Sequence, residues 1–226
     1  MFRSHALTPR GAATSLRVMA RPAPSELDEE TIPVPGSVRF PVELTPPPGF
    51  DSARLETWPR VAGRLEWVAG RLLYMPPCGE RQSWTVADLV LTLGTWVRSH
   101  PEFVLGTNEP GILLRDDVRA PDAAMWRRPD TGSASPGVSR VPPLLAVEVT
   151  GRAPDEGETA LREKARCYLD VGVGVVWILL PKERQVLVVT RAGESRHRMG
   201  ERLPTDPRLP DLVPQVDELF AQISAR

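Results

Sequence analysis

The chain has 226 residues, of which 25% are charged, and its formal net charge at neutral pH is −1. This length suits one folded domain with appendages. The near-neutral net charge provides no overall positive electrostatic field of the kind that indicates nucleic-acid binding. No run of about 18 apolar residues occurs, so we expect no membrane-spanning helix. Two cysteines, Cys78 and Cys167, and three scattered histidines exclude a disulfide framework and a Cys/His zinc motif, and they fit a reducing cytoplasm.

The first 50 residues differ in composition from the rest of the chain. They hold many of the 25 prolines, in runs such as RPAPSEL and TPPPGF, and they show no sustained hydrophobic periodicity. We therefore expect residues 1–50 to be a largely disordered N-terminal extension and residues 51–226 to be the folded domain.

Regular structure is predicted first for a hairpin and a helix. Residues 63–68 and 71–75 alternate on either side of an Ala-Gly pair, which indicates a β-hairpin. An amphipathic helix follows, with Ser83 as its expected N-cap and Pro101 just beyond its end.

The remaining patterns predict a mixed β-sheet flanked by helices, which is an α/β or α+β layer fold. The predicted elements are two strands within residues 109–128 joined by a turn at 115–119, a strand at 144–149, a helix at 157–172, a hairpin of 173–180 and 185–190, and a helix at 216–224. Gly172 is a natural glycine for the end of the helix at 157–172.

The predicted strand LLAVEV carries a carboxylate, Glu148, in an otherwise apolar sequence. Strand alternation sets Glu148 on the face opposite Val147 and Val149, between the small side chains of Ala146 and Thr150. Burying a carboxylate without a partner costs several kcal/mol of folding free energy, unless the group becomes protonated. We therefore expect Glu148 to have a partner, such as a metal ion, a cation or hydrogen-bond donors.

Lys164 is a candidate for that partner. Of the 28 Lys and Arg residues, only Lys164 and Lys182 are lysines, so a lysine here is expected where a compact ammonium is needed. Lys182 falls in a predicted turn, whereas Lys164 lies on the inward stripe of its helix, three residues after Leu161 and four before Tyr168. A snorkelling lysine and a plain ion pair with Glu148 are the structural alternatives.

Asp122 opens a short apolar strand directly after a proline, a pair that by itself usually marks a turn. Together with a glutamate in a neighbouring strand and a buried lysine, Asp122 completes a set of residues that is typical of a phosphodiesterase active site. Asp122 and Glu148 offer oxygen ligands for Mg²⁺ or Mn²⁺, and Lys164 would orient water or stabilise the developing charge. A glycoside hydrolase with the same two carboxylates is an alternative, but it leaves Lys164 unexplained.

The segments RAPDAAMW, PLLAVEVT and REKARCYLDVGVGVVWIL resemble the Uma-type restriction endonucleases, which belong to the PD-(D/E)XK nuclease superfamily. RLEWVAGRLLYMPP is similar to that family's N-terminal hairpin and RLPDLVPQVDELF to its C-terminal segment. The resemblance implies a restriction-endonuclease-like mixed β-sheet flanked by helices. It also implies that Asp122 and Glu148 are the metal carboxylates. Lys164 would be the catalytic lysine, relocated onto the helix, and Glu66 would be an additional acidic site residue.

The same resemblance implies a DNA substrate and Mg²⁺ or Mn²⁺ as cofactor, and it leaves a homodimer open. The lack of a long apolar run argues against a membrane partner. The superfamily's lysine stands two residues after the glutamate, where this chain has Thr150, so the helix would have to supply the lysine. From its strand position alone, Glu66 is equally compatible with a surface charge. The alternative function is a catalytically silent nuclease fold that binds protein or nucleic acid, which the near-neutral net charge favours.

Overall fold

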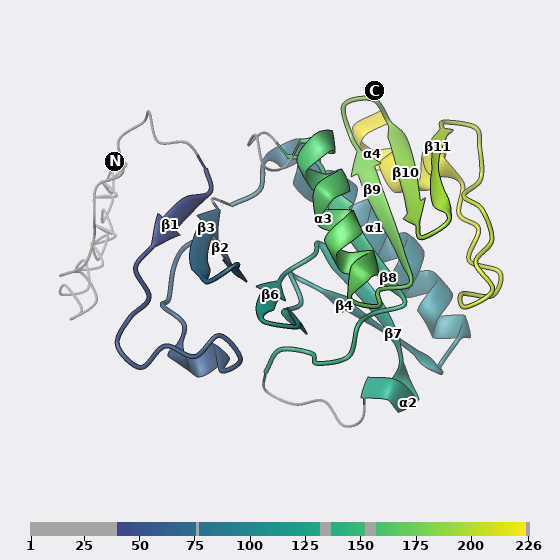
Figure 1. The fold of residues 1–226 in the computed structure, drawn as a ribbon. Helices are drawn as coiled ribbons and strands as arrows, with labels where there is room; N and C mark the ends of the chain where they lie inside the picture. Colours follow the sequence, from purple (N-terminus) through teal and green to yellow (C-terminus); the bar gives the residue numbers. More distant parts are fainter. Residues whose placement is uncertain (1–39, 76, 132–136, 152–156, 225–226) are drawn as a thin grey trace, which may run out of the picture. The chain divides into compact units, whose positions relative to one another are not determined.

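The structure is a computed structural model that describes residues 40–75, 77–131, 137–151 and 157–224 (Figure 1). The strands are β1 (Val42–Leu44), β2 (Arg64–Val68), β3 (Arg71–Met75), β4 (Phe103–Thr107), β5 (Ile112–Leu114), β6 (Asp117–Arg119), β7 (Ala123–Arg127), β8 (Leu145–Val149), β9 (Val175–Leu180), β10 (Gln185–Thr190) and β11 (Gly193–Arg198). The helices are α1 (Glu80–Ser99), α2 (Arg128–Thr131), α3 (Glu158–Asp170) and α4 (Ala221–Ser224), with 3-10 turns η2 (Leu55–Thr57) and η4 (Val216–Phe220).

The described strands form two sheets. One has the order β1-β3-β2-β6-β5, and the other has the order β11-β10-β9-β8-β7-β4. Strands β8 and β9 run parallel, with α3 between them in the chain, and the other paired strands run antiparallel. All five residues of β8 are buried, as expected for a central strand with a covered face on each side. The predicted mixed sheet flanked by helices is confirmed.

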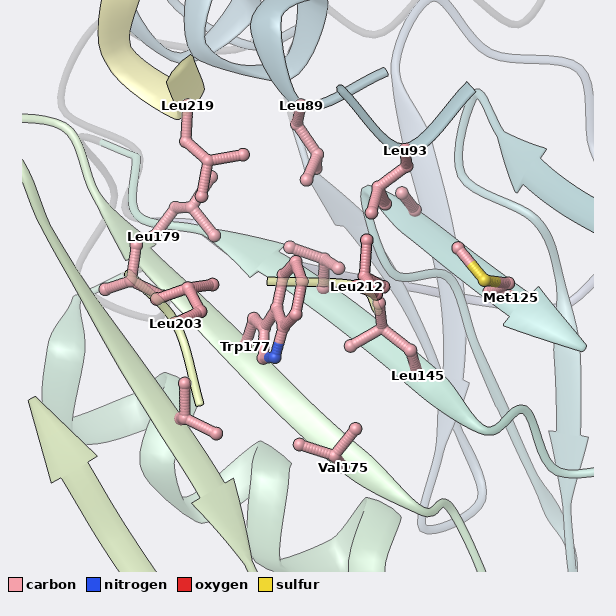
Figure 2. Close-up of a cluster of buried hydrophobic side chains, with 14 of the residues drawn as sticks. Leu89, Leu93, Met125, Leu145, Val175, Trp177, Leu179, Leu203, Leu212 and Leu219 are labelled. Carbon is pink, nitrogen blue, oxygen red and sulfur yellow. The ribbon is translucent and has the colours of Figure 1, made fainter. Parts of the chain in front are cut away.

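The six-stranded sheet separates two hydrophobic clusters. On one face, Leu145 and Val147 of β8 pack with Leu89 and Leu93 of α1 and with the C-terminal turn at Leu219 (Figure 2). On the other face, residues of β8, β9 and β10 pack under α3, whose inward residues are Leu161, Ala165, Tyr168 and Leu169. Each fully buried leucine contributes roughly 1.5–3 kcal/mol relative to an exposed one. The α3 face is also the face to which Glu148 points.

The hairpin and the end of α3 agree with the sequence patterns. Strands β2 and β3 pair around Ala69 and Gly70, which have φ angles of 50° and 77°, as a two-residue hairpin turn with left-handed positions requires. Helix α3 is followed by Gly172 at φ 107°, a conformation that a glycine adopts without steric cost.

The start of α1 differs from the prediction. The N-cap is Gly79 rather than Ser83, and the Ser83 hydroxyl lies inside the first turn, where it donates to the Glu80 carbonyl at 2.8 Å. The helix does end before Pro101, as expected. None of the helices in the described part of the chain is both long and apolar enough to cross a membrane.

Several short strands depart from the predicted elements. Residues 109–128 form three strands rather than two, because β5 and β6 pair around Arg115 in the first sheet while β7 joins the second. Strands β4 and β11 were not predicted, and the predicted C-terminal helix is a 3-10 turn followed by α4. Strand β1 lies within the predicted extension and pairs with β3. The disorder predicted for residues 1–39 falls outside the described residues.

Candidate functional site

Strand β2 carries its charged residues on the buried side. Arg64 and Glu66 are buried, whereas the apolar Leu65 and Trp67 are partly exposed. This reverses the usual pattern of a half-buried strand, in which apolar residues face the core. Glu66 is therefore not the surface charge that its position alone allowed, and only 4% of it is exposed.

Glu66 is held by donors from two segments of the chain, α3 and the end of β6. Its Oε1 accepts hydrogen bonds from Lys164 Nζ at 2.7 Å and from the Ala120 amide at 3.1 Å, and Arg119 Nη1 lies 3.5 Å from Oε2. Burial by itself would raise the pKa of Glu66, but Lys164 and Arg119 outweigh it and lower the pKa. Glu66 is therefore a stable anion at neutral pH.

Lys164 also reaches Glu148 on β8. Its Nζ lies 2.9 Å from Glu148 Oε1, and the Tyr168 hydroxyl donates to the same oxygen at 2.7 Å. Burial would lower the pKa of Lys164, yet Glu148 and Glu66 together raise it above its ordinary value. Lys164 is therefore an ammonium that bridges two carboxylates, and Glu148 has the partner that its place in an apolar strand predicted.

Asp122 lies one residue before β7, at the edge of the same site. The register sets Ala123 opposite Val147, so one residue further along Asp122 faces Glu148 across the two strands. Directly opposite residues of an antiparallel pair point to the same face. Asp122 Oδ2 accepts a 2.7 Å hydrogen bond from the Val149 amide. Burial and the nearby charge of Glu148 raise the pKa of Asp122 to about 7.

Arg64 and Glu109 are two further charged residues at the site. Arg64 Nη1 lies 4.0 Å from Asp122 Oδ1 and 3.6 Å from Glu109 Oε1. Glu109 comes from the loop between β4 and β5, where Asn108 and Glu109 both adopt left-handed backbone angles, with φ of 60° and 58°. Consecutive non-glycine residues in this region are uncommon, and such strain clusters at functional sites. Neither Arg64 nor Glu109 was predicted as a site residue.

Gln82 on α1 is a further residue that the sequence patterns missed. Its Nε2 donates to the Val149 carbonyl at 3.2 Å, next to the amide that holds Asp122. Its Oε1 is buried and has no hydrogen-bond partner among the described residues. A buried amide oxygen of this kind is usually satisfied by an ordered water or an ion. No periodicity distinguished Gln82 from other polar residues on α1.

A cavity of about 390 Å³ opens onto the carboxylates of Glu66 and Glu148, between the first sheet and α3. Glu66, Glu148 and Lys164 line it, and Arg71 and Arg119 contribute cationic groups. A second cavity of about 340 Å³ lies against β9–β11 and contains none of the predicted site residues. The first cavity is therefore the one that a substrate of the predicted site would enter.

The donor set is compatible with a hard divalent cation. In the part of the chain that the structure describes, no group of three or more His, Cys, Asp or Glu side chains forms a metal-binding cluster. Asp122 and Glu148 nevertheless present two buried carboxylates to one side of adjacent strands, and oxygen ligands of this type suit Mg²⁺ or Mn²⁺. Burial is the largest cause of the raised pKa of Asp122, and the negative charge of Glu148 is the second. Asp122 and Glu148 are therefore the two side chains that would hold a divalent cation at this site.

The structure brings together all four residues that were predicted for the site, namely Asp122, Glu148, Lys164 and Glu66. Asp122 faces Glu148 across the strands, and Lys164 bridges Glu148 and Glu66. Arg64, Arg119, Tyr168 and Glu109 surround them. The roles assigned to the four residues stay predictions.

The fold defined by the two sheets and the buried charged site is that of a nuclease-like α/β protein. A solved structure, described as "a putative nuclease belonging to DUF820" from Anabaena variabilis, is similar with a TM-score of 0.63 and 16% sequence identity, over 74% of this chain and 95% of that chain. At this identity the similarity establishes a shared fold.

Comparison with a family model gives a more specific assignment than the shared fold. The Uma2 family, described as "Putative restriction endonuclease", matches residues 53–220. The chain belongs to the Uma2 family, as the resemblance of its motifs predicted. A search of the curated proteins finds no significant match.

Proposed function

We propose that the protein is an endonuclease that hydrolyses DNA phosphodiester bonds at a PD-(D/E)XK-type site, with Mg²⁺ or Mn²⁺ as cofactor. Membership of the Uma2 family and the nuclease-like fold support this proposal. The observation that carries it is the position of Lys164 Nζ, 2.9 Å from Glu148, on the face of β8 that Asp122 shares. A cation bound by two carboxylates, with an ammonium beside it, is chemistry suited to phosphoryl transfer.

In this proposal Asp122 and Glu148 would hold the cation through their carboxylate oxygens. The bound ion would polarise the phosphate and lower the pKa of a coordinated water. Arg71 and Arg119 line the cavity and present guanidinium groups, which suit the binding of phosphate oxygens. Tyr168 would fix the Glu148 carboxylate through its hydroxyl hydrogen bond.

Lys164 would act as a cation rather than as a base. Glu148 and Glu66 raise the pKa of Lys164, so its amine stays protonated at neutral pH. A protonated Nζ can donate a hydrogen bond to the attacking water or to a phosphate oxygen that gains charge in the transition state. Glu66 would then position Lys164, since it accepts a hydrogen bond from the same nitrogen at 2.7 Å.

A catalytically silent fold that binds protein or nucleic acid is the second candidate function. It is favoured by the pairing of the carboxylates within the protein, since Lys164 and Arg119 contact Glu66, and Arg64 lies near Asp122. Such a charge cluster holds together without a cation. The near-neutral net charge of the chain also favours this candidate over a general DNA-binding surface.

Nicking of supercoiled plasmid by the full chain separates the two candidates. We expect the wild type to convert supercoiled to open-circular DNA with Mg²⁺ or Mn²⁺ and to stop when EDTA is added. Asp122→Asn and Glu148→Gln should lose this activity while remaining folded by circular dichroism. Cleavage that persists in both variants would assign the activity to another site or to a contaminant, and absence of cleavage on any nucleic acid would favour the silent fold.

A further inference from the structure

Helix α1 turns an uncharged, largely apolar stripe toward solvent. Two large hydrophobic side chains on this helix are exposed, Trp84 at 44% and Leu91 at 70%, and Ala87 is exposed between them. Within residues 82–97 the sequence has one charged residue, Asp88, and it is buried. Apolar residues that gather on one exposed face mark an interaction surface, whereas single ones scattered over a surface are ordinary.

The stripe has the spacing of a coiled coil. Its residues follow one another at intervals of four and three along the helix, and they are Glu80, Trp84, Ala87, Leu91, Gly94 and Arg98. A stripe that repeats every 3.5 residues or so stays in contact with a second helix along its whole length, when the two cross at about 20°. The 20 residues of α1 correspond to a length of about 30 Å, and the stripe runs along nearly all of it.

Gly94 has no explanation within the part of the chain that the structure describes. It lies in the interior of α1, where a glycine destabilises a helix relative to alanine. A Cβ atom added at Gly94 would meet nothing within 4 Å, and the φ angle is not left-handed, so neither packing nor backbone conformation requires a glycine there. A glycine on a helix surface does allow another side chain or backbone to approach closely.

We propose that two copies of the chain associate through α1, with the two helices antiparallel and related by a two-fold axis at the middle of the helix. In this register Trp84 packs over Gly94 of the second copy, and Leu91 packs over Ala87 of the second copy. Each large side chain therefore meets a small one. The two members of each pair lie equally far from the middle of α1, as a two-fold axis requires.

The charges at the two ends of the stripe favour the antiparallel arrangement. Glu80 and Arg98 are both exposed, and in the antiparallel register each Glu80 meets Arg98 of the second copy. A parallel pair would set Glu80 against Glu80 and Arg98 against Arg98, which is unfavourable, and it would put the two Trp84 rings in one layer and two glycines in another. The stripe therefore complements its own reversed copy. The inference uses none of the predicted site residues and goes beyond the proposed function.

The test measures the association of the full chain by analytical ultracentrifugation, without metal or nucleic acid. We expect the wild type to form a concentration-dependent dimer and Leu91→Glu to remain monomeric, because two carboxylates would enter an apolar contact. Leu55→Glu is the matched control, since Leu55 is also a leucine with 44% exposure, but on η2, and it should dimerise as the wild type does.

Gly94→Leu tests the close approach separately. The new side chain would meet nothing in the monomer, so the thermal transition of the monomer should not fall, whereas the space for Trp84 of the second copy would be filled and the dimer should be lost.

A charge exchange tests the register. Glu80→Arg and Arg98→Glu should each weaken the dimer about tenfold, because two attractive exposed pairs become repulsive. The double variant Glu80→Arg with Arg98→Glu should recover most of the affinity. Within one helix both changes place an unfavourable charge at a helix end, so their effects on the monomer add and cannot produce this recovery.

A wild type that stays monomeric overturns the inference, whatever else binds the stripe. A dimer that persists in both Leu91→Glu and Gly94→Leu places the interface on another surface and overturns it as well. Single charge variants that weaken the dimer without recovery in the double variant exclude the antiparallel register. If circular dichroism shows that Leu91→Glu is unfolded, Gly94→Leu and the charge exchange decide.

Discussion

The Tyr168 hydroxyl donates a 2.7 Å hydrogen bond to Oε1 of Glu148, and both side chains are buried. Burial and the negative charge of Glu148 raise the pKa of Tyr168 well above its ordinary value, so the phenol keeps its proton and remains a donor. The bond joins α3 to β8 at the oxygen that Lys164 also contacts. It therefore fixes one carboxylate of the site before any ligand binds.

Tyr168→Phe should destabilise the protein by about 2 kcal/mol, since a buried hydrogen bond to a charged acceptor contributes roughly 1.5–3 kcal/mol. Urea unfolding of wild type and variant measures the difference. Tyr74→Phe is the control, because the Tyr74 hydroxyl donates to the neutral carbonyl of Ala62 in an exposed setting, where the loss should be smaller. Equal unfolding midpoints for Tyr168→Phe and the wild type would show that the bond contributes no net stability.

Asp122→Asn should remove a specific pH dependence of stability. The folded-state pKa of Asp122 is about 7, above the unfolded value near 3.9, so the folded protein binds more protons between these values. The stability supplied by protonated Asp122 is complete below about pH 4 and is lost as pH rises through 7. Relative to Asp122→Asn, the wild type should therefore lose roughly 3 kcal/mol between pH 5 and pH 8.

Chemical denaturation of both proteins at pH 5, 6, 7 and 8, in metal-free buffer, measures this difference. Asn keeps an oxygen that can accept from the Val149 amide, so the hydrogen bond at this position need not be lost. A constant difference in stability across the four pH values would place the pKa of Asp122 near its ordinary value and contradict the prediction.

Lys164→Met should abolish divalent-cation-dependent nicking while the protein still folds. Removal of the ammonium leaves Glu66 and Glu148 without a shared cation, so some stability is also lost, on the order of 3–5 kcal/mol for a broken buried pair. Lys182→Met, at the exposed turn between β9 and β10, removes the other lysine and should leave nicking unchanged.

Lys164→Arg is the finer variant. The charge is kept, but a planar guanidinium does not replace a compact ammonium between two carboxylates, so nicking should fall by at least about tenfold. The measurement is the plasmid assay at a temperature where circular dichroism shows equal folding. Full activity in Lys164→Met would contradict a catalytic role for Lys164 and would show that its ion pairs with Glu66 and Glu148 are only structural.

Mg²⁺ or Mn²⁺ should raise the melting temperature of the wild type and not that of Glu148→Gln. A ligand present at a hundred times its dissociation constant stabilises the folded state by about 2.7 kcal/mol. Differential scanning fluorimetry with increasing Mn²⁺ measures the shift. Glu163→Gln, which alters an exposed carboxylate of α3 at the same cavity, should shift as the wild type does. An equal shift in Glu148→Gln would locate cation binding elsewhere.

Local sequence patterns were sufficient for the residues on β8 and α3. Strand alternation placed Glu148 opposite the apolar face, and the helical period placed Lys164 on the inward stripe, and both positions hold in the structure. Glu66, in contrast, was predicted only from the resemblance to the family's N-terminal hairpin. The position of a charged residue in a short strand does not by itself show which face of the strand is buried. The catalytic roles of these residues, in contrast, stay predictions.

The rest of the site depends on long-range pairing that local patterns do not contain. Glu66 and Lys164 are 98 residues apart in the chain, and Glu109 reaches Arg64 through an uncommon loop conformation. Strand β11, with the polar sequence GESRHR, is formed by pairing with β10 rather than by a buried apolar face. Backbone pairing at a sheet edge leaves little hydrophobic periodicity to find.

The inward-facing charges of β2 have a consequence for how variation at this site can be tolerated. Arg64 and Glu66 have opposite signs and share the buried face of β2, so their charges offset each other on that face. Replacing either residue alone leaves the buried face of β2 with a net charge, whereas replacing both by apolar side chains of similar volume restores neutrality. Substitutions at these two positions should therefore be coupled, and each is expected to be tolerated better in the presence of the other than alone.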